Sequence, residues 1–226
     1  VDNGATLTIE GEGNIEGSSY GVYAKNGTLN IKSGNFTAET SAVQVGAATV
    51  NIEGGTFSNT DEDKRYTINC LDANWKDGTS KVNITGGTFI DFNPANNHAE
   101  GVGTNFCAKG FTALIDDNGY TVVQVVAVSN KDELKNVFKK DGDIKGVIKL
   151  DSDIVTDARL YVNAGNKVHF DMNGKKIQVE ESYNDYIFYI REGGTLIIDG
   201  NGTVEAETPA PVVFCPVGDL IIESGT

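Results

Sequence analysis

Two polar stretches, residues 59–65 and 71–78, hold the side chains best suited to contact a ligand. Trp75 is the only tryptophan among the 226 residues, and its neighbours are polar. An exposed indole can stack on a sugar ring or on a partner chain, and Tyr66 and Asp72 would add aromatic and hydrogen-bonding contacts. The alternative is that Trp75 folds back over an adjacent element. These three residues form the binding site that the sequence predicts.

The sequence predicts no metal or cofactor site. Asp91, His98 and Glu100 carry suitable ligand atoms, but their spacing fixes no geometry and a solvated loop explains them better. Asp116, Asp117 and Asn118 lack the remaining ligands of a calcium-binding loop.

The sequence also predicts no catalytic residues. Glycoside hydrolysis needs two carboxylates facing each other, whereas Asp61, Glu62 and Asp63 share one loop, with Asp72 as their nearest partner. Acidic-polysaccharide cleavage needs a cationic groove, and no two Lys or Arg residues occupy matching outward positions on neighbouring repeats. His169 should point outward alone. We therefore expect a protein that is not an enzyme.

Composition restricts the classes of partner. The formal net charge of −14, with no stripe of Lys or Arg, argues against nucleic-acid binding. No apolar run is long enough to span a membrane, so no membrane insertion is expected. Three cysteines make no disulfide framework, and Cys70 and Cys215 are predicted to fill equivalent inward positions as small apolar residues.

A recurring phrase determines the fold class. Copies begin near Ala5, Gly27, Ala47, Ser80 and Gly194, with a further one at Gly218, and most are separated by about 22 residues. Within a copy, apolar and polar residues alternate, which indicates a strand with one buried face. A glycine or asparagine follows, and then a second strand with a large inward residue such as Phe36, Phe57 or Phe89.

Three short strands in each period, separated by Gly, Asn and Ser corners, predict an all-β fold: a right-handed parallel β-helix, or β-solenoid. Phe36, Phe57 and Phe89 should then stack inside it, and Asn30, Asn51 and Asn83 should form a ladder outside. A left-handed hexapeptide helix would need an apolar residue at every sixth position, and a leucine-rich repeat would need an LxxLxL phrase.

The pattern predicts three segments. Residues 1–92 read as β-helix coils, and residues 93–128 as a connecting loop followed by a closing β-hairpin that turns at Asn118–Gly119. Residues 129–226 read as a second β-helix module. It begins with an amphipathic capping helix over residues 129–140, with Ser129 as the expected N-cap.

The two ends of the sequence could join without breaking the repeat. The last phrase, residues 220–226, stops midway through a coil and could run on into residues 1–5. We therefore expect either a window from a longer tandem protein or copies that stack head to tail.

The phrases themselves suggest a family. The stretch NKDELKNVFKK…GVIKLDSDI resembles the N-terminal cap of pectin-lyase-like right-handed β-helices. The stretch GGTFIDFNPANNHAEGVGTNFCAKGF…GYTVV resembles a closing phrase of β-helical proteins from gut bacterial surfaces and from bacteriophages of gut bacteria, including virion fibre proteins. The resemblance covers nearly the whole chain, and Cys107 departs from it where a small aliphatic residue is expected.

The resemblance implies an extracellular, non-catalytic structural and adhesive module, as in a bacteriophage head fibre or tail-associated protein. The alternatives are a bacterial cell-surface adhesin that binds glycans and a polysaccharide lyase or hydrolase. The expected partners are further copies, as a trimer or a head-to-tail stack, other virion or surface proteins, and cell-surface glycans. Because fold alone does not assign function, these remain expectations.

Overall fold

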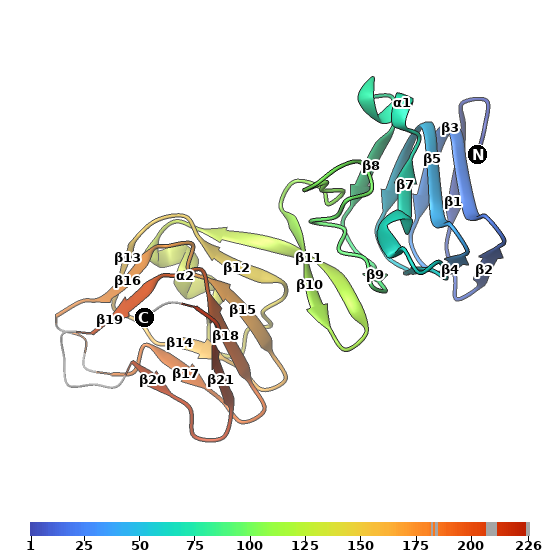
Figure 1. Cartoon of the computed structure of the whole chain (residues 1–226). Helices are drawn as coiled ribbons and strands as arrows, with labels where there is room; N and C mark the ends of the chain where they lie inside the picture. Colours follow the sequence, from blue (N-terminus) through green and yellow to red (C-terminus); the bar gives the residue numbers. More distant parts are fainter. Residues whose placement is uncertain (182, 184, 207–211, 225–226) are drawn as a thin grey trace. The chain divides into compact units, whose positions relative to one another are not determined.

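A computed structural model describes residues 1–181, 183, 185–206 and 212–224. The chain divides into two compact units, Val1–Val123 and Gln124–Thr226. In both, short parallel strands stack coil upon coil, so the predicted parallel β-solenoid is confirmed (Figure 1).

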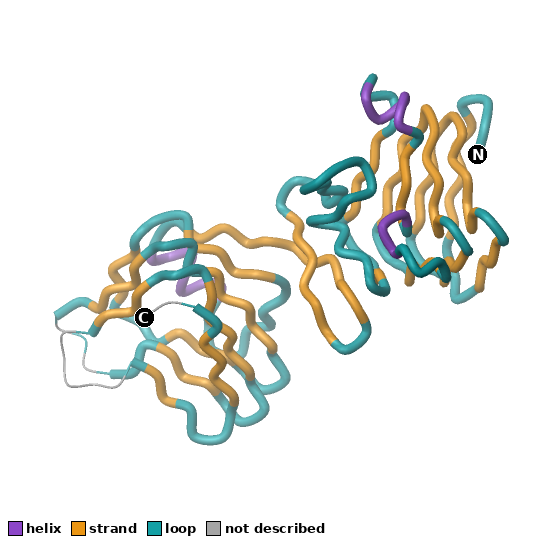
Figure 2. Tube along the Cα trace, in the orientation of Figure 1, coloured by secondary structure: helices purple, strands orange, loops and turns teal. Residues whose placement is uncertain are grey.

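The first unit has two parallel sheets and a hairpin (Figure 2). One sheet contains β1 (Ala5–Ile9), β3 (Tyr20–Ile31), β5 (Ser41–Ile52), β7 (Ile68–Cys70) and β8 (Lys81–Ile84). The other contains β2 (Asn14–Gly17), β4 (Asn35–Ala38), β6 (Thr56–Asn59) and β9 (Thr88–Phe89). The hairpin strands are β10 (Phe111–Asp116) and β11 (Gly119–Val128), and the short helices are η1 (Lys64–Tyr66) and α1 (Asp72–Lys76).

The second unit begins with α2 (Lys131–Val137). The last part of β11 pairs in parallel with β12 (Val147–Leu150), and β15 (Lys167–Asp171), β18 (Thr195–Asp199) and β21 (Asp219–Ile222) follow. Two further parallel sheets contain β13 (Ile154–Thr156), β16 (Lys176–Val179) and β19 (Thr203–Glu205), and β14 (Leu160–Val162), β17 (Phe188–Ile190) and β20 (Val213–Phe214).

Equivalent side chains lie in columns, as the repeat predicts. Phe36 pairs in register with Phe57, and Phe57 with Phe89. Their rings stack at centroid distances of 5.0 and 4.9 Å, and all three side chains are buried. Outside, the amide of Asn51 donates to Asn30 at 2.9 Å, and that of Asn83 donates to Asn51 at 3.0 Å. Stacking the coils therefore satisfies both the apolar interior and a polar outer ladder.

Residues 93–110, expected only to connect, cover the end of the first core. Phe92 and Phe106 are buried against the aromatic column, with ring centroids of Phe89 and Phe92 6.1 Å apart. The backbone N–H of Ile84 donates to Phe106, and the N–H of Ala108 donates to Ile84, as a further coil would do. The loop therefore does more than connect the two segments, which was all that the sequence suggested, because Phe106 and Ala108 take the place of a further coil.

Two predicted details are wrong by one residue. The hairpin exists, but its turn consists of Asp117 and Asn118, and Gly119 already begins β11. The N-cap of α2 is Asn130, whose side chain accepts from the N–H of Glu133, while Ser129 donates its backbone N–H to the Glu133 carboxylate. Both Ser and Asn are good caps, so the residue type alone did not separate them.

Candidate functional site

The three residues of the predicted binding site do not come together. Tyr66 ends η1, which precedes β7, whereas Asp72 and Trp75 lie on α1, which follows it. Strand β7 (Ile68–Cys70) therefore separates Tyr66 from Asp72 and Trp75 along the coil. Trp75 folds back onto the core of the first unit and meets Phe106 edge-on, with ring centroids 5.6 Å apart. Trp75 therefore takes the alternative position considered from the sequence, in which it folds back over an adjacent element.

The three considered metal ligands do not form one site either, because Glu100 lies apart from Asp91 and His98. Glu100 is half-buried, and its carboxylate accepts from the backbone N–H of Cys70 at 2.7 Å. Burial raises the pKa of Glu100, although the bond from Cys70 opposes that shift. Asp91 and His98 line a separate hollow of about 290 Å³ beside Arg65. Within the described ranges, no group of three or more His, Cys, Asp or Glu side chains could hold a metal ion.

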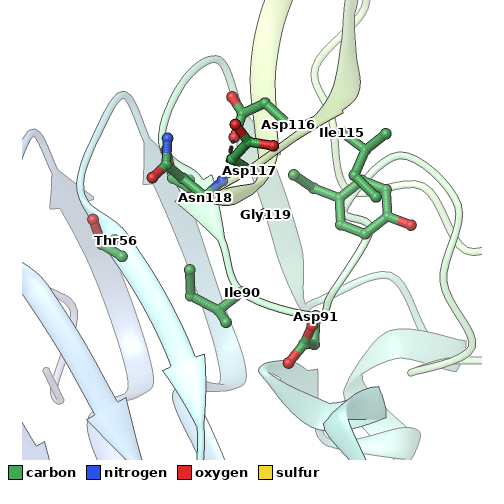
Figure 3. A pocket seen from close by; sticks show the side chains of 10 residues that line it. Thr56, Ile90, Asp91, Ile115, Asp116, Asp117, Asn118 and Gly119 are labelled. Carbon is green, nitrogen blue, oxygen red and sulfur yellow. Dashed lines mark hydrogen bonds between the residues drawn. The ribbon is translucent and has the colours of Figure 1, made fainter.

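A larger hollow of about 670 Å³ lies beside the hairpin turn (Figure 3). Its acidic side chains are Asp91, Asp116 and Asp117, and Asp91 lies away from the other two. Asp116 accepts from the N–H of Asn118 at 2.7 Å and from the hydroxyl of Thr121 at 3.2 Å. The carboxylate thus stabilises the turn, and we assign no ligand to this hollow.

Two of the three thiols, those of Cys70 and Cys107, are poor nucleophiles. Burial raises the pKa of Cys70 to about 12, and the Glu100 carboxylate adds to the shift. Burial also raises the pKa of Cys107 to about 11. Only a thiolate attacks readily, so both side chains are unreactive at neutral pH. The prediction that Cys70 fills an inward position is confirmed by its register with Val45 and by its burial.

A different surface gathers aromatic and cationic side chains on the second unit. It lies on β14, β17 and β20, and we call it the Arg–Tyr face, defined by Arg159, Tyr161, Tyr186, Tyr189, Arg191 and Phe214. Tyr161 pairs in register with Tyr189, and Tyr189 with Phe214. On both sides of each tyrosine the strand residues are buried, so the tyrosines point outward.

The rings form a column that follows the coils. The centroids of Tyr161 and Tyr189 are 5.8 Å apart, and those of Tyr189 and Phe214 are 5.3 Å apart. Tyr186 stacks on Phe214 at 4.5 Å. The three sheet positions repeat at the coil spacing of about 4.8 Å, because parallel strands carry equivalent residues at equal heights.

Both arginines lie against this column. The guanidinium carbon of Arg159 is 5.8, 5.8 and 5.3 Å from the ring centroids of Tyr161, Tyr186 and Tyr189. That of Arg191 is 5.4 Å from the Tyr161 centroid. These distances are typical of cation–π contacts, which are stronger when the cation is partly desolvated. Both arginine side chains are 29% exposed, so they are partly desolvated and still open to a ligand.

Each arginine also has a carboxylate partner. Arg159 pairs with Asp185, which in turn accepts from the N–H of Tyr186 at 2.8 Å. That backbone bond and the arginine lower the pKa of Asp185. Arg191 donates from Nη1 to Asp141 at 2.7 Å. The pairs therefore place a carboxylate beside each guanidinium group.

An open hollow of about 470 Å³ runs beside these side chains. Its lining residues come from several coil loops and strands: Lys140, Arg159, Tyr161, Tyr189, Arg191, Glu192, Pro216 and Val217. A hollow with aromatic walls and a few convergent polar groups is the usual form of a small-ligand site.

Sequence reasoning missed this face because the arginines are not at equivalent positions. Leu160 pairs with Phe188, so Arg159 precedes its strand, whereas Arg191 follows its own. Arg159 and Arg191 therefore do not meet the requirement that two cations occupy matching positions on neighbouring coils. The usable signal was the paired phrases Arg-Leu-Tyr-Val and Phe-Tyr-Ile-Arg, each with an outward tyrosine.

Comparison with known proteins identified no relative: no family model, curated protein or solved structure matches the chain. In the described part of the chain, no helix is both long and apolar enough to cross a membrane. Functional assignment therefore depends on the geometry of the Arg–Tyr face.

Proposed function

We propose that this chain is a non-catalytic structural and adhesive module of an extracellular assembly, a bacteriophage virion fibre or tail-associated protein. The Arg–Tyr face contacts a glycan of the target surface. Each unit provides a stacked scaffold: in the first, inward columns and the outward Asn ladder continue from coil to coil, and in the second, parallel strands pair in register over successive coils.

One observation carries the adhesive role. A solenoid needs only solvated polar residues on its outer side, yet β14, β17 and β20 present Tyr161, Tyr189 and Phe214 there. Tyrosine combines an apolar ring with a hydroxyl, so it packs against sugar C–H groups and bonds to sugar hydroxyls. Aromatic residues and arginine are also the side chains most enriched at binding hot spots.

The arginine chemistry favours binding over catalysis. Burial lowers the pKa of Arg159, but its bond to Asp185 and the charge of that carboxylate outweigh burial, so the pKa is raised. A lyase would instead need a cationic side chain whose pKa is depressed toward neutrality, so that it can remove a proton. This argues against Arg159 as such a base.

Binding of oligosaccharides to the immobilised chain tests the proposal. We expect Tyr189→Ala to lower affinity about tenfold or more, since an aromatic contact contributes up to about 1.5 kcal/mol in addition to burial and about 1.4 kcal/mol is tenfold. Tyr20→Ala is the matched control, because Tyr20 is an outward tyrosine of the first unit with its own tyrosine neighbour, Tyr23, at 5.8 Å. Release of shortened sugars during the assay would contradict the non-catalytic assignment.

Labelling of intact particles tests the assembly. An antibody against the chain should decorate fibres or tails of virions in electron micrographs. Decoration of bacterial envelopes alone would favour the cell-surface adhesin, which would use the same Arg–Tyr face.

A further inference from the structure

We propose that the Arg–Tyr face selects uncharged sugar chains, built from hexoses without carboxylate or sulfate groups. This inference rests on the adhesive function proposed above and names the ligand class of that site. It follows from the charges already paired at the face, from the hydrogen-bonding groups left over, and from the spacing of the rings.

The charges at the face cancel. Arg159 is paired with Asp185 and Arg191 with Asp141, so neither arginine offers a free positive charge. The hollow adds Lys140 and Glu192, which again carry opposite charges. An acidic sugar would have to displace a carboxylate from an arginine, and the chain's formal net charge of −14 would repel it.

The hydrogen-bonding groups suit hydroxyls. An arginine has five N–H donors in a fixed plane. Arg191 gives one of them to Asp141 and keeps others for a ligand, whereas Arg159 also bonds to the side chains of Tyr161 and Tyr183. The Nε of Arg159 is enclosed and does not reach a ligand, so the outward donors of the face are on the Nη atoms. Arginine donors beside carboxylate acceptors match a sugar hydroxyl, which can donate one hydrogen bond and accept another. An anionic group can only accept hydrogen bonds, so it would meet Asp141 and Asp185 with like charge and without a donor for them.

The ring column sets the direction of the bound chain. Tyr161, Tyr189 and Phe214 follow one another at centroid steps of 5.8 and 5.3 Å, across successive coils. A pyranose ring is comparable in length to such a step. We therefore expect a short oligosaccharide to lie along the solenoid axis, about one sugar for each coil.

The test compares neutral and acidic oligosaccharides at low and high salt. The panel contains gluco-, manno- and galacto-oligosaccharides together with oligogalacturonate and hyaluronan fragments. We expect binding to at least one neutral series, lost about tenfold in Tyr189→Ala, retained in Tyr20→Ala, and changed less than about twofold by salt. Equal thermal midpoints of the variants by circular dichroism separate lost binding from lost folding.

A second variant tests the charge argument directly. Asp141→Asn with Asp185→Asn frees both arginines, while the amide oxygen introduced at position 185 can still accept from the N–H of Tyr186. We expect this double variant to gain salt-sensitive binding to acidic fragments by about tenfold or more, because two unpaired guanidinium groups then face the ligand.

The outcomes separate the two proposals. Strong, salt-sensitive binding of acidic fragments by the unaltered chain would overturn the selectivity and leave the adhesive function standing. Absence of binding to every sugar, or binding unaffected by Tyr189→Ala in a folded variant, would overturn both.

Discussion

The aromatic column of the first unit gives the sharpest test of the fold. Phe57 is completely buried, and its ring stacks between Phe36 and Phe89 at 5.0 and 4.9 Å, with interplanar angles of 7° and 14°. Phe57→Ala removes both contacts and leaves a cavity that neighbouring coils cannot fill, because their backbones are fixed by the parallel ladder. The expected loss of unfolding free energy is about 4 kcal/mol.

Trp75 provides a local assay for this change. It is the only tryptophan, and it packs against the core of the first unit. Its fluorescence during urea unfolding therefore follows that unit. With a denaturant dependence of about 2 kcal/mol per molar, the midpoint should fall by about 2 M urea. Phe57→Leu keeps most of the apolar volume and should lose about 1–2 kcal/mol, mainly the two ring contacts.

Ile115→Ala is the control, because Ile115 is a large apolar residue of the same unit that remains 66% exposed. We expect its effect to stay within about 0.5 kcal/mol. A loss below about 1 kcal/mol for Phe57→Ala, or equal losses for Phe57→Ala and Ile115→Ala, would refute the claim that stacked inward columns stabilise the unit.

Three further predictions concern caps, corners and pH. Asn130→Ala should lower the stability of the second unit by about 1 kcal/mol in urea unfolding followed by circular dichroism, whereas Ser129→Ala, which keeps the cap, should change little. Gly86→Ala should lower the unfolding free energy of the first unit by about 2–3 kcal/mol, as followed by Trp75 fluorescence, because the new Cβ would overlap the carbonyl oxygen of Glu53. Gly13→Ala is the control and should be tolerated, because open space surrounds that position. The pKa of Glu100 in the folded state is raised above 4.5, so ionisation of Glu100 should lower the stability of the first unit as pH rises from 4.5 through that pKa. Glu100→Gln should remove this part of the pH dependence of stability. An unchanged pH profile in Glu100→Gln would contradict the prediction.

Much of the first unit followed from spacing. Phe36, Phe57 and Phe89 recur in the same phrase, and in a parallel stack residues at equal phase must meet. For the same reason an outward ladder was expected, and its asparagines do bond to one another. In both cases each coil repeats the previous one, so local sequence already contains the neighbour's identity.

The prediction was less complete where the repeat is broken. Phe92, Phe106 and Glu100 occur in an irregular loop, and no period shows that they close the core of the first unit. Trp75 was placed by its contact with Phe106, which lies far along the chain in that loop. Such contacts depend on how a loop folds back.

The sequence by itself determined the solenoid, its approximate period and the inward column of Phe36, Phe57 and Phe89, because a regular alternation can bury its apolar face only by stacking like on like. Only the tertiary structure decided the Arg–Tyr face. Arg159 and Arg191 lie at different phases of their coils, and they meet at Tyr161 because long guanidinium side chains reach across the strand from opposite ends. Where side chains cross between columns, their meeting depends on conformation and distance as well as on position in the repeat.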